Sequence, residues 1–287
     1  GLKKIGLNVK LIKPKFQDLT HYFKVSVPLI VGQSIAVMDE QLFRIFGSML
    51  SVGAIASFRY ARRIAILPVG VMAQAVGVAS FPTMSNLFVR EKFEELKQLI
   101  RQQIAILYFV NLAIVLVLIT NNAEIISLVY ERGEFNSSDV LRVSSIMSIV
   151  AFGILPWSLN QIVTRSFYVQ SNYWYPVLVG TSSTVLATLI ILNTENKSEI
   201  SYATIIISSL FLYSLILLAT LKIDGEKILN KNLISDLIIS SVIYFVTLGI
   251  IQFLPIDNFG KFLYIFISTT IIALSFIVSV RVIKMKY

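Results

Sequence analysis

The sequence predicts an all-α integral membrane protein with about eight transmembrane helices, and two observations support this fold class. Hydrophobic residues make up 56% of the chain and charged residues only 14%, whereas soluble domains carry about 25% charged residues. Apolar stretches of about 20 residues, the length that crosses a bilayer as a helix, recur along the chain. The expected spans run approximately over residues 25–50, 54–86, 98–120, 138–169, 174–193, 200–221, 233–254 and 259–283.

Polar or charged residues interrupt the first, second and fourth spans, so we expect these three to line something other than lipid. Pro68 and Pro82 should bend or loosen the second span. The third span should begin in an amphipathic helix that carries the run REKFEELKQLIRQQ. Asn136 is the expected N-cap of the fourth span, with Asp139 at N3 completing a capping box.

The distribution of Lys and Arg predicts the orientation of the chain in the membrane. Residues 1–24, the connection near 88–101, the segment 222–231 and the C-terminal tail are rich in these residues, and the intervening connections are poor in them. Because basic connections stay in the cytoplasm, an even number of spans places both ends there. Residues 1–24 lack the apolar core of a signal peptide, so we interpret them as a cytoplasmic linker from an earlier span of a longer protein.

The residue types present argue against an enzyme. The chain has no cysteine and one histidine, His21, which excludes disulfides, thiolate metal sites and cysteine nucleophiles. We find no metal-ligand cluster, no phosphate-binding Gly-rich loop and no nucleophile beside a base. We therefore predict no catalysis, no metal and no cofactor, although a membrane transferase that uses only carboxylates stays open. The net charge of +9 comes from segments that flank spans and does not indicate nucleic acid.

Charges inside the first two spans are the main functional signal. A charge near the bilayer centre costs at least ~2.5–3.5 kcal/mol, so it faces a partner or a watery cavity. The four arginines and two carboxylates of these spans leave two positive charges uncompensated. The guanidinium fork suits phosphate and diphosphate oxygens, which predicts an anionic head group as ligand. The residues expected to bind the head group are Arg63, Arg62, Arg59 and Arg44. Arg59, Arg62 and Arg63 lie in the second span and share one helix face at i, i+3, i+4 spacing.

Internal charge pairing is the alternative explanation for these residues. Glu40 and Arg44 are four residues apart on one helix, and Asp39 could neutralise Arg62 or Arg63. Asp39 and Glu40 are also candidates for ion or proton coupling, because intramembrane carboxylates often serve that role.

Three segments resemble the MurJ (MviN) lipid II flippases of the multidrug/oligosaccharidyl-lipid/polysaccharide flippase superfamily. The run SFRYARRIAILPVGVMAQAVGVASFPTMSNL resembles the family's signature span, in which Tyr-Ala-x-Arg leads to Leu-Pro-x-Gly and Phe-Pro-x-x-Ser. The runs SLVYERGEFNSSDV and TRSFYVQSNYWYPV resemble two later segments of the family, in the same order. Together they cover much of residues 25–180, and the last four spans match by hydropathy.

The resemblance implies two six-helix lobes around a central cavity, followed by two helices that form a groove for a polyprenyl tail. Residues 25–222 would be the second lobe and residues 223–287 the two additional helices. The implied activity moves lipid II, or a similar undecaprenyl-diphosphate glycolipid, to the outer leaflet of the bacterial plasma membrane by alternating access. The implied partners are that lipid, membrane lipids and an N-terminal lobe missing from this chain.

Matched motif to motif, Arg63 falls on the family's cavity arginine and Arg44 on the arginine of the preceding span's motif. Relatives often carry an acid where this chain has Arg62 and Phe43. The fifth span lacks the Asn and Asp that some members use near a cation site. Three other functions remain open: a flippase for another undecaprenyl-linked oligosaccharide (O-antigen or exopolysaccharide), a drug/cation antiporter, which the basic cavity disfavours, and a non-transporting membrane scaffold that binds lipid-linked glycans.

Overall fold

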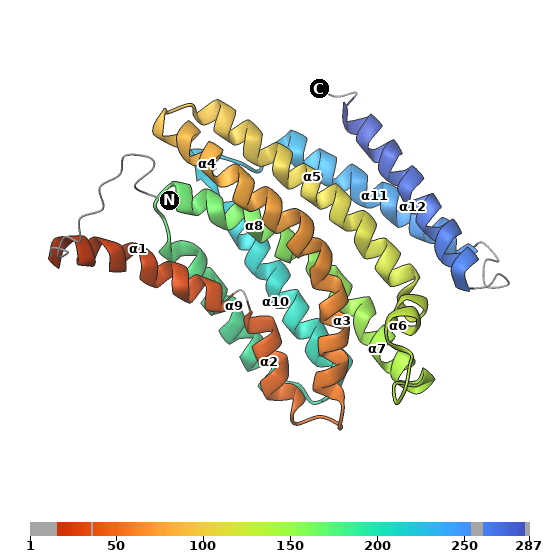
Figure 1. The fold of residues 1–287 in the computed structure, drawn as a ribbon. Helices are drawn as coiled ribbons and strands as arrows, with labels where there is room; N and C mark the ends of the chain where they lie inside the picture. Colours follow the sequence, from red (N-terminus) through yellow and green to blue (C-terminus); the bar gives the residue numbers. More distant parts are fainter. Residues whose placement is uncertain (1–15, 36, 254–260, 285–287) are drawn as a thin grey trace, which may run out of the picture.

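The computed structural model describes residues 16–35, 37–253 and 261–284, which form a helical bundle with one short β-hairpin (Figure 1). The helices of the first half are α1 (Phe16–Ile35), α2 (Met38–Gly47), α3 (Ala54–Pro68), η2 (Val69–Gln74), α4 (Ala75–Val89), α5 (Phe93–Thr120) and α6 (Asn122–Tyr130). Those of the second half are α7 (Ser137–Val150), η3 (Ala151–Gly153), α8 (Ile154–Val169), α9 (Trp174–Asn193), α10 (Glu199–Thr220), α11 (Lys231–Phe253) and α12 (Lys261–Lys284). Strands β1 (Lys222–Ile223) and β2 (Glu226–Lys227) lie between α10 and α11.

Six helical segments of the described residues are long and apolar enough to cross a membrane: Ala54–Val89, Phe93–Thr120, Ser137–Val169, Trp174–Asn193, Glu199–Thr220 and Lys231–Ile251. Two shorter apolar helices, Tyr22–Gly32 and Leu263–Val278, lie where the first and last spans were expected. The all-α membrane fold with about eight apolar helices is therefore confirmed.

The first expected span, over 25–50, is wrong as a single helix. Helix α1 ends at Ile35 and α2 begins at Met38, and Figure 1 shows the chain turning a corner between them. Val37, the N-cap of α2, has a non-helical backbone with φ −112° and ψ 8°. A helix that starts here places Asp39 and Glu40 in its first turn, where the helix dipole favours negative charge.

The second expected span is continuous but contains a wider turn. The π-helix η2 follows directly on Pro68, which lacks a backbone N–H and crowds the preceding turn. The prediction that proline loosens this span is thus confirmed at Pro68. The fourth span is similarly divided, because the 3-10 turn η3 joins α7 to α8. At its start the expected capping box is confirmed: Asn136 accepts from the backbone of Asp139, and the Asp139 carboxylate accepts from the backbone of Asn136 at 3.0 Å.

The β-hairpin lies in the basic segment 222–231 and contacts the basic residues Lys97 and Arg101 at one end of the bundle. Its turn residues Asp224 and Gly225 both have positive φ, 51° and 76°, the backbone of a two-residue type I′ turn. The buried ammonium of Lys97 donates to Glu226 in the hairpin and to Glu94 at 2.6 Å. Arg101 donates to the carbonyls of Ile228 and Lys227 at 2.9 and 3.1 Å. The Lys97 ammonium holds the pKa of the exposed Glu226 carboxyl below its usual range.

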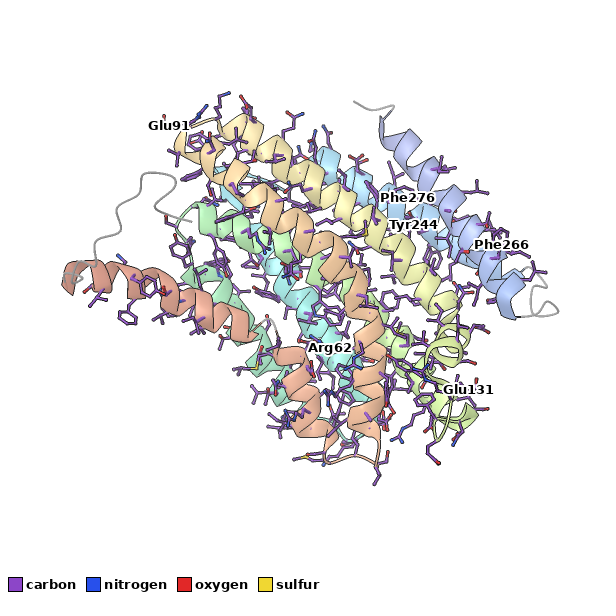
Figure 2. The ribbon with its side chains drawn as sticks, viewed as in Figure 1. Arg62, Glu91, Glu131, Tyr244, Phe266 and Phe276 are labelled. Carbon is purple, nitrogen blue, oxygen red and sulfur yellow. The ribbon has the colours of Figure 1, made fainter. Side chains whose placement is uncertain are left out.

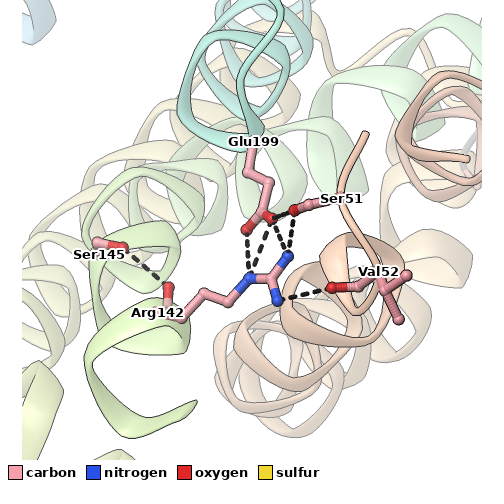
Figure 3. A network of polar contacts seen from close by, with 5 residues as sticks. All are labelled: Ser51, Val52, Arg142, Ser145 and Glu199. Carbon is pink, nitrogen blue, oxygen red and sulfur yellow. Dashed lines mark hydrogen bonds and ion pairs between the residues drawn. The ribbon is translucent and has the colours of Figure 1, made fainter. Parts of the chain in front are cut away.

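At the opposite end of the bundle, Arg142 links three segments of the chain through hydrogen bonds and an ion pair (Figure 3). Arg142 on α7 binds Glu199, the first residue of α10, and donates to Ser51 Oγ at 2.7 Å and to the Val52 carbonyl at 2.8 Å. It thereby ties the α2–α3 turn to α7 and α10. Gly53 at that turn has φ +92°, and a Cβ there would lie 2.8 Å from Arg142 Nη1.

Helices α11 and α12 pack beside α5 at one flank of the bundle (Figure 1). Tyr244, labelled in Figure 2, donates to the Phe109 carbonyl at 3.3 Å, and Tyr108 and Ser241 share a hydrogen bond of 2.7 Å. Ser268 on α12 donates to Asn121 at 2.8 Å. These two helices therefore contact the main bundle through polar pairs as well as apolar packing.

Gly53→Ala should lower the thermal stability of the protein in detergent more than Gly133→Ala does. Both replacements force a side chain into positive φ, which costs about 1–2 kcal/mol, but only the Cβ at Gly53 displaces Arg142. A second substitution, Glu199→Gln, should therefore destabilise the wild type more than the Gly53→Ala variant. Equal effects of the two glycine changes, or strict additivity with Glu199→Gln, would contradict the role of Arg142.

Candidate functional site

The buried charges of the first two spans come together where α2 meets α3. Arg62 lies between these helices (Figure 2), and its guanidinium binds both carboxylate oxygens of Asp39. The Nε–Oδ2 distance is 2.7 Å and the Nη2–Oδ1 distance is 3.2 Å, which is a bidentate pair. Nη1 lies 3.2 Å from Glu40 Oε2, and the guanidinium stands 5.3 Å from the ring centre of Trp157 on α8.

Arg62 is therefore the most enclosed of the predicted arginines. Its side chain is 13% exposed and that of Asp39 is 1% exposed. Removing a charged pair from water costs several kcal/mol per ion unless the geometry is good, and here all three guanidinium nitrogens have an acidic partner. Internal pairing, one of the two explanations of these charges, is thus observed for Asp39 with Arg62.

Arg59 and Arg63 border a groove of about 470 Å³ beside this pair, on the side lined by Glu40. Its lining residues are Glu40, Ala56, Arg59, Tyr60, Arg62, Arg63 and Ile66. Arg59 is 63% exposed and reaches Glu40 only at 3.6 Å. Arg63 is exposed, and no carboxylate of the described residues lies within ion-pair distance of it. The groove thus presents cationic groups whose nearest acids are already bound to Arg62.

Aromatic side chains flank the groove. The ring centres of Tyr60 and Tyr130 are 4.7 Å apart, and Phe135 stands 5.5 Å from Tyr60. Burial raises the pKa of the Tyr130 hydroxyl, and the nearby positive charge of Arg63 opposes that rise. Tyr130 lies in α6, so a helix outside the long spans approaches Arg63.

The expected pair of Glu40 with Arg44 is not formed, which corrects that alternative. Glu40 instead binds Arg62 and Arg59, because the pair with the enclosed Arg62 is less screened by water than one with an exposed arginine. Arg44 is exposed on α2 and does not line the groove. The four predicted arginines thus occupy three settings: enclosed and paired, exposed in the groove, and exposed outside it.

A second cavity, of about 550 Å³, lies on the side of the Arg62 pair lined by Asp39 and was not predicted. Its lining includes Asp39 from α2 and two residues of α8, Arg165 and Trp157. Arg165 is a charge within the fourth span, so the reasoning applied to the first two spans would have found it. In the described part of the chain no three His, Cys, Asp or Glu side chains converge to hold a metal ion.

Comparisons with known proteins agree on one family. The family described as "Lipid II flippase MurJ" matches residues 1–273. The probable lipid II flippase MurJ of Rhizobium tropici is 26% identical over 189 residues, covering 62% of this chain and 33% of the relative. The corresponding protein of Helicobacter pylori strain 26695 is 28% identical over 158 residues, covering 54% and 33%. That of Treponema pallidum is 25% identical over 175 residues, covering 60% and 33%.

A solved structure titled "Lipid II flippase MurJ, inward closed conformation" superposes with a TM-score of 0.75 at 20% sequence identity. The superposition covers 94% of this chain and 56% of the solved chain, and at this identity it establishes a shared fold. The matched segment spans about a third of the length of the curated relatives. The match over 273 residues shows that this multi-pass membrane protein belongs to the lipid II flippase MurJ family.

Proposed function

We propose that this chain is the second half of a flippase that moves lipid II from the inner to the outer leaflet of the bacterial plasma membrane. One observation carries the proposal: the groove holds an exposed arginine, Arg63, while both nearby carboxylates are bound to Arg62. A cationic groove in a membrane protein suits the diphosphate of a lipid-linked sugar. Membership of the MurJ family supports lipid II as the cargo.

Each of the four arginines has a different role in this proposal. Arg63 binds the diphosphate through its guanidinium fork, and Arg59 adds a second positive charge at the rim of the groove. Arg62 positions α3 against α2 and contributes its charge without leaving Asp39. Arg44 stands outside the groove and acts only if the cargo extends along α2. Asp39 and Glu40 serve as counter-ions in this scheme, with ion or proton coupling as the alternative.

The remaining parts of the chain take the places that the family implies. Residues 25–222 form the second transporter lobe, residues 223–287 supply two helices beside which the polyprenyl tail lies, and residues 1–24 link to an N-terminal lobe. Residues 93–101 and the hairpin meet at one end of the bundle, while Ser51 and Glu199 meet at the other. This grouping supports the predicted alternation, with both ends of the segment in the cytoplasm.

The groove supports binding and release rather than covalent chemistry. Transport by alternating access needs two lobes that rock about a shared site near the middle of the membrane. An exposed arginine binds a diphosphate less tightly than a buried one, because water screens the contact. Release on the far side of the membrane therefore needs no chemical step.

Arg63→Ala in the full-length protein should abolish growth when that protein is the sole lipid II flippase of a depleted bacterium. Arg63→Lys should restore growth only partly, because lysine keeps the charge but lacks the bidentate fork. Lys197→Ala, which removes an exposed cation outside the groove, is the matched control and should grow as wild type does. Membrane abundance of each variant is measured by immunoblot.

Wild-type growth with Arg63→Ala would refute the role of Arg63. Failure of the wild-type protein itself to replace the flippase would instead favour another undecaprenyl-linked oligosaccharide as cargo. Binding of lipid II by the wild-type protein without its movement in vesicles would favour the scaffold function.

Asp39→Asn should destabilise the protein more than Glu40→Gln does. Asp39 is enclosed and engages two guanidinium nitrogens, and breaking a buried pair costs about 3–5 kcal/mol; Glu40, 31% exposed, supplies one close contact to Arg62. Thermal unfolding in detergent should rank the variants in that order. The double change Asp39→Asn with Arg62→Gln should recover part of the loss, and a further loss would contradict the pairing.

A further inference from the structure

The second cavity, of about 550 Å³, is distinct from the proposed cargo groove. The two share one lining residue, Ile66, and the Arg62 pair stands between them: Asp39 lines the cavity and Glu40 lines the groove. Helices α1, α2, α3, α4, α8, α9 and α10 and the π-helix η2 all contribute residues to its lining. Its volume lies within the usual range for small-molecule sites, about 300–1,000 Å³.

Arg165 is the cation that this cavity contains. Its Nη1 donates to the carbonyl oxygen and the side-chain oxygen of Gln161, at 2.5 and 2.7 Å. No carboxylate of the described residues pairs with Arg165, and both oxygens of Asp39 are taken by Arg62. Among the described residues, Arg165 is therefore a cation of the cavity lining without an ion-pair partner.

The Arg165 guanidinium occupies space that a side chain at Gly77 would fill. Gly77 on α4 stands beside it, where a Cβ would lie 2.8 Å from Arg165 Nη1 and 3.0 Å from the Gln161 carbonyl oxygen. Any larger residue at this position would displace the arginine or the backbone of α8. The absence of a side chain at Gly77 thus lets Arg165 stay at the cavity wall.

A second group in the lining also lacks a partner. Trp157 is 6% exposed, and its Nε1 is a buried donor without a hydrogen bond in the described structure. An indole N–H can only donate, and a guanidinium can only donate. Asn160 accepts from Ser214 at 2.9 Å through its side-chain oxygen, which leaves its amide nitrogen as a further donor. An unpaired buried donor costs about 1–3 kcal/mol, so an acceptor placed at Trp157 Nε1 would be stabilised there.

We propose that this cavity binds an anion bearing phosphate oxygens, with Arg165 as its charge partner and Trp157 Nε1 as a hydrogen-bond donor. The donors favour an anion over a cation, and the uncompensated charge favours a single phosphate group. A phosphate alone would leave most of the volume empty, and apolar residues such as Val69, Val177 and Leu210 line the remainder. The phosphate belongs either to a free anion or to the head of a lipid.

The test measures binding of radiolabelled inorganic phosphate to the full-length protein in detergent. All variants carry Arg63→Gln, so that phosphate bound in the cargo groove does not contribute and failure of the proposed function does not affect the result. Saturable binding should persist in this background. Arg165→Gln should weaken it by at least about tenfold, the loss expected for a charged hydrogen bond. Arg165→Lys should lie between the two.

Trp157→Phe keeps a ring beside Arg62 and removes the N–H, so it should weaken phosphate binding severalfold even if Arg165→Gln fails to fold. Competition by a short prenyl diphosphate identifies the source: stronger competition than by inorganic diphosphate indicates a lipid head, and equal competition indicates a free anion. The proposal is overturned if neither phosphate nor prenyl diphosphate binds saturably. It is equally overturned if folded Arg165→Gln and Trp157→Phe proteins bind phosphate as the parent does.

Discussion

The arrangement of these helices depends on one constraint: a guanidinium enclosed among apolar helices must keep its counter-ions. Arg62 meets that constraint with Asp39 and Glu40, two successive residues in the first turn of α2. The break before α2 puts both carboxylates in a first helical turn, where the helix dipole also favours negative charge. The same group of charges stands between the groove and the second cavity, because Glu40 lines the groove and Asp39 lines the cavity.

Pairing of one arginine determines what the others can do. With both carboxylates engaged, Arg63 and Arg165 remain as cations on opposite sides of the Arg62 pair. Arg63 is open to water and suits a ligand that must come and go, since exposed ion pairs are weak. Arg165 is partly enclosed and is braced by Gln161, so an anion held there is screened less and exchanges more slowly.

The sequence predicts features that depend on neighbouring residues and misses those that depend on distant ones. Apolar length and basic connections located the helices, and Asn136 with Asp139 identified a helix start, because capping is decided within four residues. Helical spacing placed Arg59, Arg62 and Arg63 on one face but could not tell that Arg62 turns inward toward Trp157. The pairing of Glu40 and the cavity around Arg165 require helices far apart in the chain. The hairpin was missed although Asp224 and Gly225 are a strong local signal for it.

The hairpin and Asn121 join α11 and α12 to the two ends of α5. Lys97 and Arg101 bind the hairpin near the start of α5. Asn121, which follows the last residue of α5, accepts a hydrogen bond from Ser268 on α12. A helix pair held at both ends of α5 moves together with α5, so α11 and α12 follow any movement of that helix. In the proposed transport function, a lipid tail lying along α11 and α12 would therefore move with the helices that contact the polar groups of α5.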